Sequence, residues 1–439
     1  MMENTQNQCS RRDFVKTSAA LSLGTMGLIG ARAYAAGSDT LSVGLIGCGG
    51  RGRGAAVNIL DAAPGVELYA LGDLFQEPLD AAFRQLSQTR PESPMAKMGN
   101  TINVTRERCF VGFDAYQKVI NCGVDVVLMA TPPHFRPIHL QAAAQAGKHS
   151  FIEKPVAVDP VGVRSVIATS ALARKKNLAI VAGTQRRHSN LYLEIIKRIH
   201  QGDIGRIVGG QTYFLIHNTP WLGKHRRQRR PEWSDMEWQC RCWYWFNWLS
   251  GDHIVEQFVH SLDFMNWALG AHPVSCIGVG GREVRKGPDY GNIYDHFSIE
   301  YEYPEDLRIS AMCRQIDSCT DRISDRVVGS KGLAYLDGAT AKIQGARSYK
   351  YDGPVHNPQV QEHADMIAGI RAGQPLNHGK RIAESTLTAI IGRMSAYTGR
   401  ALKWDWALKA SKLDLSPPHY GFGDLPVRPI AVPGTTKLT

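Results

Sequence analysis

Residues 41–52 read LSVGLIGCGGRG, and this stretch decides the fold of the first part of the chain. Its first six residues form an apolar run of the kind found in buried strands. Gly47, Gly49 and Gly52 follow in the spacing G-x-G-x-x-G, and a helix is expected over residues 52–61. In this pattern the first glycine permits a tight turn, the second lets a pyrophosphate approach the backbone, and the third lets helix and strand pack closely. The stretch therefore predicts a dinucleotide site.

Further candidate contacts to a dinucleotide lie beside the glycines. Gly50 and Arg51 directly precede the expected helix, whose N-terminus offers free N–H groups and partial positive charge to phosphates. Asp73 follows the last glycine by 21 residues, after a second strand expected at 66–71. Its carboxylate would accept hydrogen bonds from ribose hydroxyls and repel a 2′-phosphate, and no arginine follows at 74–77. We therefore expect NAD rather than NADP; the alternative is a glycine turn beside a surface aspartate.

The wider pattern predicts two domains, as the length of 439 residues suggests. Residues 39–155 alternate short strands with helices, which is typical of a doubly wound parallel Rossmann sheet. Residues 156–405 contain runs of longer strands and favour an α+β domain with an open-faced, mostly antiparallel sheet. Residues 406–439 are expected to be a C-terminal tail. Strands are expected at 124–130, 149–152, 178–182, 206–216, 294–303, 307–314 and 325–328, helices at 160–176 and 381–400, and irregular segments at 87–108 and 218–250.

Residues 1–35 are interpreted as a removable export signal. The run SRRDFVK at 10–16 resembles a twin-arginine motif, a weakly apolar stretch follows at 19–30, and Ala33-Tyr34-Ala35 offers a cleavage site. The alternative is a disordered basic tail. Substrates of this pathway are exported folded, so a cofactor can be bound in the cytoplasm and carried out. We expect a periplasmic or exported protein.

Composition narrows the class of protein. The charged fraction of 21% and the hydrophobic fraction of 43% are typical of soluble globular proteins, and no apolar run is long enough to span a bilayer in the mature chain. The net charge is +11, yet no nucleic-acid motif accompanies it. The basic run KHRRQRR at 224–230 is either a solvated loop or a rim that attracts anionic carbohydrate.

The eight cysteines after residue 35 form no CxxC pair, and no metal site is expected.

Glu153-Lys154-Pro155 follows the strand expected at 149–152. Open α/β sheets bind ligands beyond the carboxyl ends of their strands, so Lys154 is placed to reach a reacting carbon. The alternative is an ordinary surface lysine before a proline.

Two histidines and two carboxylates share the helical spacing of residues 251–270. His253, Glu256, His260 and Asp263 recur every three or four residues, which places them on one helix face. His260 is a candidate general base, with Glu256 one turn earlier to orient it. The alternatives are a wetted helix face and, with less support because the sequence is not H-E-x-x-H, a metal site.

With these pieces in view, the chain resembles the Gfo/Idh/MocA family of glucose-fructose oxidoreductase and inositol dehydrogenase relatives over about residues 40–405. The resemblance depends on five motifs. They are GLIGCGGRG at 44–52, ATPPHFRPIH at 130–139, FIEKPVAVD at 151–159, GTQRRH at 183–188 and HIVEQFVHSLDFMNWALG at 253–270.

The resemblance implies roles for individual residues. Lys154 would lie beside nicotinamide and substrate, and the acid-before-histidine pattern falls on Glu256 and His260, with Glu where the family usually has Asp. The Lys154–Pro155 bond is expected to be cis, and the second domain to mediate a homo-oligomer, a dimer or a tetramer. The remaining cofactor-side candidates are Thr131, Pro132, His134 and Glu153, and the substrate-side candidates are Gln185, Arg187 and His253.

These observations predict an exported NAD-dependent oxidoreductase that acts on a secondary hydroxyl of a sugar, polyol or glycoside. Trp245 and its neighbours in segment 221–248 are candidates to stack on sugar rings; the alternative is packing in a core. A rival hypothesis is a redox-neutral glycosidase that oxidises, eliminates and reduces again with the same NAD. A third is a dinucleotide-bound binding protein without turnover.

Overall fold

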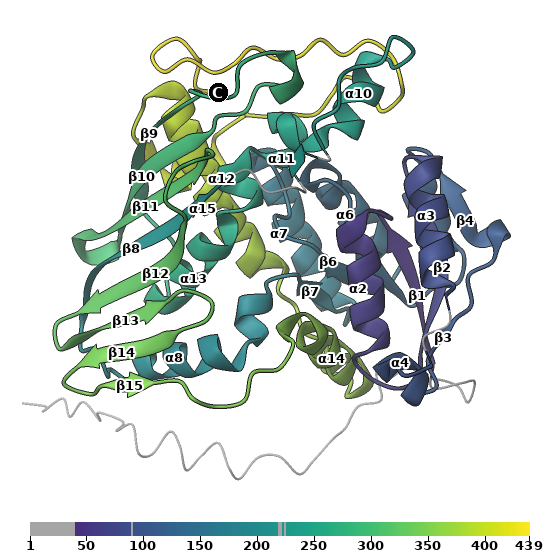
Figure 1. The fold of residues 1–439 in the computed structure, drawn as a ribbon, viewed down its shortest axis with the longest axis horizontal. Coiled ribbons are helices and arrows are strands. Elements are labelled where there is room, and N and C mark those ends of the chain that lie inside the picture. The colour runs from purple at the N-terminus through teal and green to yellow at the C-terminus, as the bar shows by residue number, and fades with distance from the viewer. Residues whose placement is uncertain (1–39, 89–90, 218–221, 224) are drawn as a thin grey trace, which may run out of the picture. The chain divides into compact units, whose positions relative to one another are not determined.

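The computed structural model describes residues 40–88, 91–217, 222–223 and 225–439 (Figure 1). Thr40–Thr439 form one compact unit. The expected export signal lies outside the described residues. Within the described ranges, no helix is both long and apolar enough to cross a membrane.

The first sheet confirms the predicted doubly wound parallel architecture. Its order is β3-β2-β1-β5-β6-β7, with β4 also paired to β2, and every pairing is parallel. The strands are β1 (Leu41–Ile46), β2 (Val66–Asp73), β3 (Thr101–Ile102), β4 (Cys109–Val111), β5 (Val126–Met129), β6 (His149–Ile152) and β7 (Ile180–Ala182). The helices of this half are α2 (Gly50–Leu60), α3 (Gln76–Leu86), α4 (Pro94–Lys97), α5 (Ala115–Asn121), α6 (Arg136–Gln145) and α7 (Pro160–Lys175).

Local sequence explains these elements. All four residues of β5, VVLM, are buried, as a central parallel strand requires. The helix α7 begins where Asp159 accepts a hydrogen bond from the Gly162 N–H and Pro160 occupies the first turn. The segment 87–108, expected to be irregular, contains α4 and β3.

The parallel sheet continues beyond residue 155. The strand β7 pairs with β6, and a distant segment covers the open side of β7. Ile180 N–H donates to the Leu376 carbonyl at 2.8 Å, and His378 N–H donates to the Ile180 carbonyl at 2.7 Å. The helix α14 (Pro358–Arg371) precedes this segment and also packs on α2.

The second sheet is mostly antiparallel, as predicted. Its order is β15-β14-β13-β12-β8-β11-β10-β9-β16, and only the β8–β11 pair is parallel. One face is packed against α13 and α15, as Figure 1 shows. The strands are β8 (Ile207–Ile216), β9 (Ser275–Gly281), β10 (His296–Tyr303), β11 (Leu307–Gln315), β12 (Arg322–Gly329), β13 (Gly332–Leu336), β14 (Ala341–Gly345), β15 (Tyr349–Lys350) and β16 (Leu402–Lys403). Its helices are α8 (Asn190–His200), α12 (His253–Glu256), α13 (Val259–Leu269), α15 (Gly379–Thr398) and α16 (Trp404–Lys409).

The described part of segment 218–250 is a loop only in part, because residues 225–234 have no helix or strand whereas residues 235–250 are mostly helical. It contains α10 (Asp235–Arg241), the 3-10 turn η4 (Trp243–Trp245) and α11 (Asn247–Ser250). Four of its tryptophans are buried in one hydrophobic cluster, so packing outweighed the loop-like composition. The tail beyond residue 410 has no helix or strand, yet it runs past α10 in Figure 1 and is hydrogen-bonded to it.

Candidate active site at the carboxyl edge of the parallel sheet

The glycine loop has the geometry that its sequence predicts. Gly47 has φ +98°, and a Cβ there would lie 2.6 Å from the Ala130 carbonyl carbon. A Cβ on Gly52 would lie 1.8 Å from the Gly47 carbonyl oxygen. By contrast, a Cβ on Gly49 or Gly50 would meet no atom within 4 Å. The loop therefore leaves open space at the N-terminus of α2, where a pyrophosphate can approach free N–H groups.

Asp73 lies at the end of β2 and is tied to the glycine loop. One carboxylate oxygen accepts the Cys48 N–H at 2.7 Å, and the other accepts the Phe75 N–H at 2.9 Å. Burial raises the pKa of Asp73, and these backbone bonds oppose that rise. Each oxygen retains acceptor capacity, which fits the ribose role expected from the sequence.

Arg136 connects the loops after β5 and β6. Its buried guanidinium donates to the Thr131 carbonyl at 2.9 Å and to the Pro155 carbonyl at 2.6 Å. Thr131 Oγ1 also lies 3.3 Å from His139 Nδ1. The Lys154–Pro155 bond is cis, as the resemblance implied. These bonds fix the loop that carries Thr131 and Pro132 beside Lys154.

Lys154 and Glu256 meet at the centre of the site. Lys154 Nζ lies 3.1 Å from Glu256 Oε1 and also donates to the Glu256 carbonyl. The neighbouring Glu153 accepts from Arg51 Nε at 2.5 Å, so the start of α2 is joined to the end of β6. Lys154, Glu153 and Glu256 are all buried, so their charges act on one another with little screening by water.

His260 joins this group as an uncharged imidazole. Burial and the nearby positive charges of Lys154 and Arg186 hold the pKa of His260 well below its usual value. Arg186, a residue the sequence reasoning did not select, donates to the His260 carbonyl at 3.4 Å and to Asp325 Oδ2 at 2.8 Å. At neutral pH the imidazole is therefore unprotonated, which is the form that a general base requires.

The helix expected at 251–270 is broken, and this break moves His253 away. Phe258 N–H donates to the His253 carbonyl, five residues back, at 3.1 Å, which is the spacing of a π-bulge. Gln257 and Phe258 form a turn that separates α12 from α13. His253 is buried with its ring 5.1 Å from Phe297, and neither ring nitrogen has a hydrogen-bond partner among the described residues. The structure therefore does not bring His253 to Lys154.

Arg187 and Asp263 form a separate ion pair. Arg187 binds the Asp263 carboxylate at 2.8 and 3.0 Å, and its guanidinium lies 4.7 Å from the Trp267 ring. Burial alone would raise the pKa of Asp263, but Arg187 and Arg381 outweigh it and hold the pKa far below its usual value. The guanidinium of Arg187 is thus already engaged. Gln185 begins the 3-10 turn η3 (Gln185–His188) and is half-buried.

Trp245 and His134 pack in the aromatic cluster. Trp245 is 2% exposed, with its ring edge-on to Tyr290 at 5.3 Å. The structure supports the packing alternative for this tryptophan. His134 Nε2 lies 2.8 Å from the Tyr420 hydroxyl, and burial lowers the pKa of His134 to about 4.

Glu362, on α14, is a neighbour of the site that sequence reasoning missed. It is buried, and Glu362 Oε2 has no hydrogen-bond partner among the described residues. Burial, followed by the negative charge of Glu153, raises the pKa of Glu362 well above its usual value, while Arg51 opposes that rise. No motif marks this residue, because it lies more than 200 positions along the chain from Glu153.

A metal site and a surface cavity are the other kinds of site that bear on function. Over the described ranges, no group of three or more His, Cys, Asp or Glu side chains is placed to hold a metal ion.

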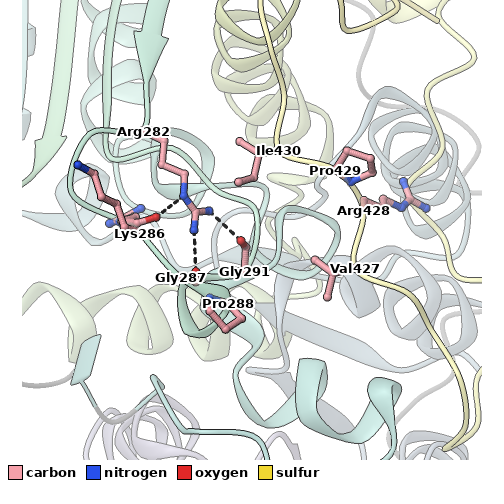
Figure 2. A pocket seen from close by; sticks show the side chains of 10 residues that line it. Arg282, Lys286, Gly287, Pro288, Gly291, Val427, Arg428, Pro429 and Ile430 are labelled. Atoms are coloured by element: carbon pink, nitrogen blue, oxygen red, sulfur yellow. Dashed lines mark hydrogen bonds between the residues drawn. The ribbon is translucent and has the colours of Figure 1, made fainter.

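A cavity of about 710 Å³ is lined by residues between 282 and 291 and by tail residues 427–430 (Figure 2). Figure 2 shows the Arg282 guanidinium donating to the Gly287 and Gly291 carbonyls, so this charge holds the loop together. None of the lining residues belongs to the candidate active site.

Curated relatives match the chain at low identity. 2,7-Anhydro-N-acetylneuraminate hydratase of Escherichia coli (strain K12) is 26% identical over 206 residues, which are 47% of this chain and 50% of the relative. Alpha-N-acetylgalactosaminidase of Shewanella oneidensis is 24% identical over 44% of this chain and 39% of its own. The chain thus spans about half or less of these two relatives. Inositol 2-dehydrogenase of Acidiphilium cryptum (strain JF-5) is 24% identical over 69% of this chain and 76% of its own.

A solved structure and a family model agree on the fold. The aldose-aldose oxidoreductase of Caulobacter crescentus, solved with glycerol, superposes with a TM-score of 0.64 at 19% identity, covering 83% of this chain and 99% of that one. Residues 41–184 match the family model described as "Oxidoreductase family, NAD-binding Rossmann fold" (GFO_IDH_MocA). This range includes the glycine loop, Asp73 and Lys154. Residues 41–184, about a third of the chain, are therefore similar to the NAD-binding Rossmann domains of this oxidoreductase family, and they have the fold that the description names.

Proposed function

We propose that this protein is an exported, NAD-dependent oxidoreductase that moves a hydride between a secondary hydroxyl of a sugar, polyol or glycoside and a tightly bound nicotinamide. One observation carries the proposal. An ammonium group, Lys154, held by Glu256, lies beside the neutral imidazole of His260 just beyond the end of β6. Alcohol oxidation requires removal of the hydroxyl proton, and this pair is suited to remove it.

The residues around the glycine loop fit NAD. Gly49 and Gly50 leave room for the pyrophosphate, and Asp73 is placed to accept bonds from the adenosine ribose. Thr131 and Pro132 lie on the loop that Arg136 fixes beside Lys154. A carboxylate at position 73 disfavours the 2′-phosphate of NADP. We further propose that export of a folded protein requires NAD to be retained as a resident group.

Each catalytic side chain has a separate task in the proposed reaction. Bound NAD supplies the hydride acceptor. His260 accepts the hydroxyl proton at a ring nitrogen, while Lys154 donates a hydrogen bond to the same oxygen and stabilises its developing negative charge. Glu256 is a positioning residue, because its carboxylate and carbonyl hold the Lys154 ammonium.

The proposal is tested by what the purified protein contains and does. Denaturation should release NAD or NADH, identified with its redox state by mass spectrometry. Addition of candidate sugars and polyols should then change the nicotinamide absorbance of the native protein. A purified protein that contains no nicotinamide dinucleotide and does not bind added NAD would contradict the proposal.

A redox-neutral glycosidase is the second candidate function. It is favoured by the relatives named alpha-N-acetylgalactosaminidase and glycosyl hydrolase family 109 protein. Incubation with p-nitrophenyl glycosides without added NAD separates the two candidates. Release of p-nitrophenol without net NADH indicates the glycosidase, whereas accumulation of NADH indicates the dehydrogenase. NAD binding without either activity would favour a binding protein without turnover.

A further inference from the structure

Four aromatic rings gather at the carboxyl edge of β2 and β4. Phe75 and Phe113 come from the loops after these strands, whereas Tyr420 and Phe422 come from the C-terminal tail. The Phe422 ring stacks on Phe75 at 5.8 Å with an interplanar angle of 11°, and lies edge-on to Phe113 at 5.3 Å. Tyr420 lies 6.4 Å from Phe113. The tail thus contacts the Rossmann domain with aromatic side chains.

Residues 415–428, here called the strap, are held in place by hydrogen bonds to both halves of the protein. Leu415 N–H donates to Asp159 Oδ2 at 2.8 Å. Gly423 N–H donates to the Ser234 hydroxyl at 3.1 Å, and Leu425 N–H donates to Asp235 Oδ2 at 3.0 Å. These are backbone donors bound to fixed acceptors. The strap therefore has a defined course along this edge of the sheet.

The strap crosses the edge of the parallel sheet where the adenosine half of a bound dinucleotide is expected to lie. In a doubly wound sheet the ligand lies outside the carboxyl ends of the strands, and the first three strands of the fold serve the adenosine half. Asp73, the ribose candidate, precedes Phe75 by two residues. On the other side, Tyr420 reaches His134 in the turn after β5, with the hydroxyl 2.8 Å from Nε2. Because β1 lies between β2 and β5 in the sheet, these two contacts lie on either side of the strand that leads into the glycine loop.

The two aromatic side chains of the strap are partly exposed to solvent. Phe422 is 50% exposed and Tyr420 is 40% exposed, although both belong to a packed aromatic group. Large aromatic rings that remain exposed beside a ribose-binding carboxylate offer a flat apolar surface. Adenine is a flat π-system, and bases stack readily on phenylalanine and tyrosine.

We propose that the strap, through Phe422 and Tyr420, forms the outer wall of the adenine pocket and retains the dinucleotide in this protein. The inference depends on the proposed function, because it assumes that NAD occupies the glycine loop. It adds residues from the C-terminal tail to a site that the Rossmann domain otherwise builds alone. The dinucleotide then leaves only when the strap separates from Phe75 and Phe113.

The test measures retention of NAD by Phe422→Ala and by the milder Phe422→Leu, which keeps an apolar side chain and removes the ring. Val432→Ala is the control, because Val432 is 52% exposed in the same tail but outside the strap. Proteins with equal circular dichroism are diluted, and the NAD lost with time is quantified by mass spectrometry. Binding of NAD and of nicotinamide mononucleotide, which has no adenosine, is compared by calorimetry.

Loss of one base–aromatic stack should speed NAD release about 5- to 100-fold in Phe422→Ala, and in the same direction in Phe422→Leu. Val432→Ala should match the wild type, and the affinity for nicotinamide mononucleotide should not change. Unchanged NAD release in a folded Phe422 variant overturns the strap inference while the proposed function stands. A wild-type protein that neither contains nor binds NAD overturns both.

Discussion

At the scale of residues, two glycines of one motif face different surroundings. A Cβ at Gly52 would collide with the Gly47 carbonyl, whereas one at Gly49 would enter open space. The close packing predicted for Gly52 is found in the structure, because a G-x-G-x-x-G turn after a strand constrains its own backbone, whereas the pyrophosphate role of Gly49 stays a prediction. Lys154 and Glu256 come from two separate motifs and meet in the structure, and the charge of Lys154 lowers the pKa of His260; their catalytic roles stay predictions.

The same substitution to alanine at Gly49 and at Gly52 is expected to have different effects. Gly49→Ala should leave the free energy of unfolding within about 1 kcal/mol of the wild type but weaken NAD binding, because the new methyl group occupies the pyrophosphate space. Gly52→Ala should lower the free energy of unfolding by roughly 1–3 kcal/mol, because the helix must shift away from β1. Urea denaturation and NAD titration of both variants check this. Equal stability of the two variants would contradict it.

The catalytic pair gives a second prediction. Lys154→Met and His260→Ala should each lower kcat by about 10²–10⁴-fold, the usual contribution of positioned acid–base groups. Both variants should still release NAD on denaturation, because the glycine loop and Asp73 are untouched. His217→Ala, at an exposed histidine directly after β8, is the control and should have wild-type activity. Activity that survives in both site variants would remove Lys154 and His260 from the mechanism.

At the scale of elements, the failures of sequence reasoning have physical causes. Regular 3.6-residue spacing placed His253 with His260, but the π-bulge at Phe258 adds one residue to the turn and separates them. Trp245 lies in a segment whose richness in tryptophan and arginine predicts a loop. In the structure its aromatic neighbours pack with it in a buried hydrophobic cluster. Glu362 carries no local signal, because only the packing of α14 on α2 brings it near.

The second sheet gives a prediction at this scale. Val279 and Ile277 on β9 are 69% and 54% exposed, and Met312 on β11 is 36% exposed. Pairing of Val279 with Ser298, and of Ser298 with Met312, puts these apolar side chains on one open face. We expect this face to join copies of the chain, so Val279→Asp should lower the molar mass measured by light scattering. Val355→Asp, in an exposed loop, should not. A wild-type monomer would contradict the expectation.

At the scale of the whole molecule, buried neutral histidines make stability depend on pH. Burial lowers the pKa of His139 to about 3 and that of His134 to about 4, both below the value near 6.5 expected in the unfolded chain. Between these values the unfolded state binds more protons than the folded state. Stability is therefore fully present above pH 6.5 and falls as the pH drops towards 4.

This linkage gives the fourth prediction. Lowering the pH from 7 to 5 should cost about 2 kcal/mol of unfolding free energy for His139 alone. His139→Phe keeps a ring to stack on Tyr116, which lies 4.3 Å away, and should reduce the pH 7-to-5 difference by about that amount. Urea denaturation at the two pH values measures it for both proteins. An identical pH dependence in the variant would contradict the prediction, because it would mean that His139 binds protons equally in the folded and unfolded states.

The hydrogen bonds between Ile180 and segment 376–378 make the Rossmann domain dependent on the rest of the chain. Residues 41–184 produced alone would end in β7 with its outer N–H and C=O groups bare, and an unpaired parallel strand is a template for intermolecular pairing. A fragment cut at residue 184 would thus tend to aggregate. Extending it through residue 378 would restore the missing edge. We therefore expect the end of the family match at residue 184 to differ from the end of a unit that folds on its own.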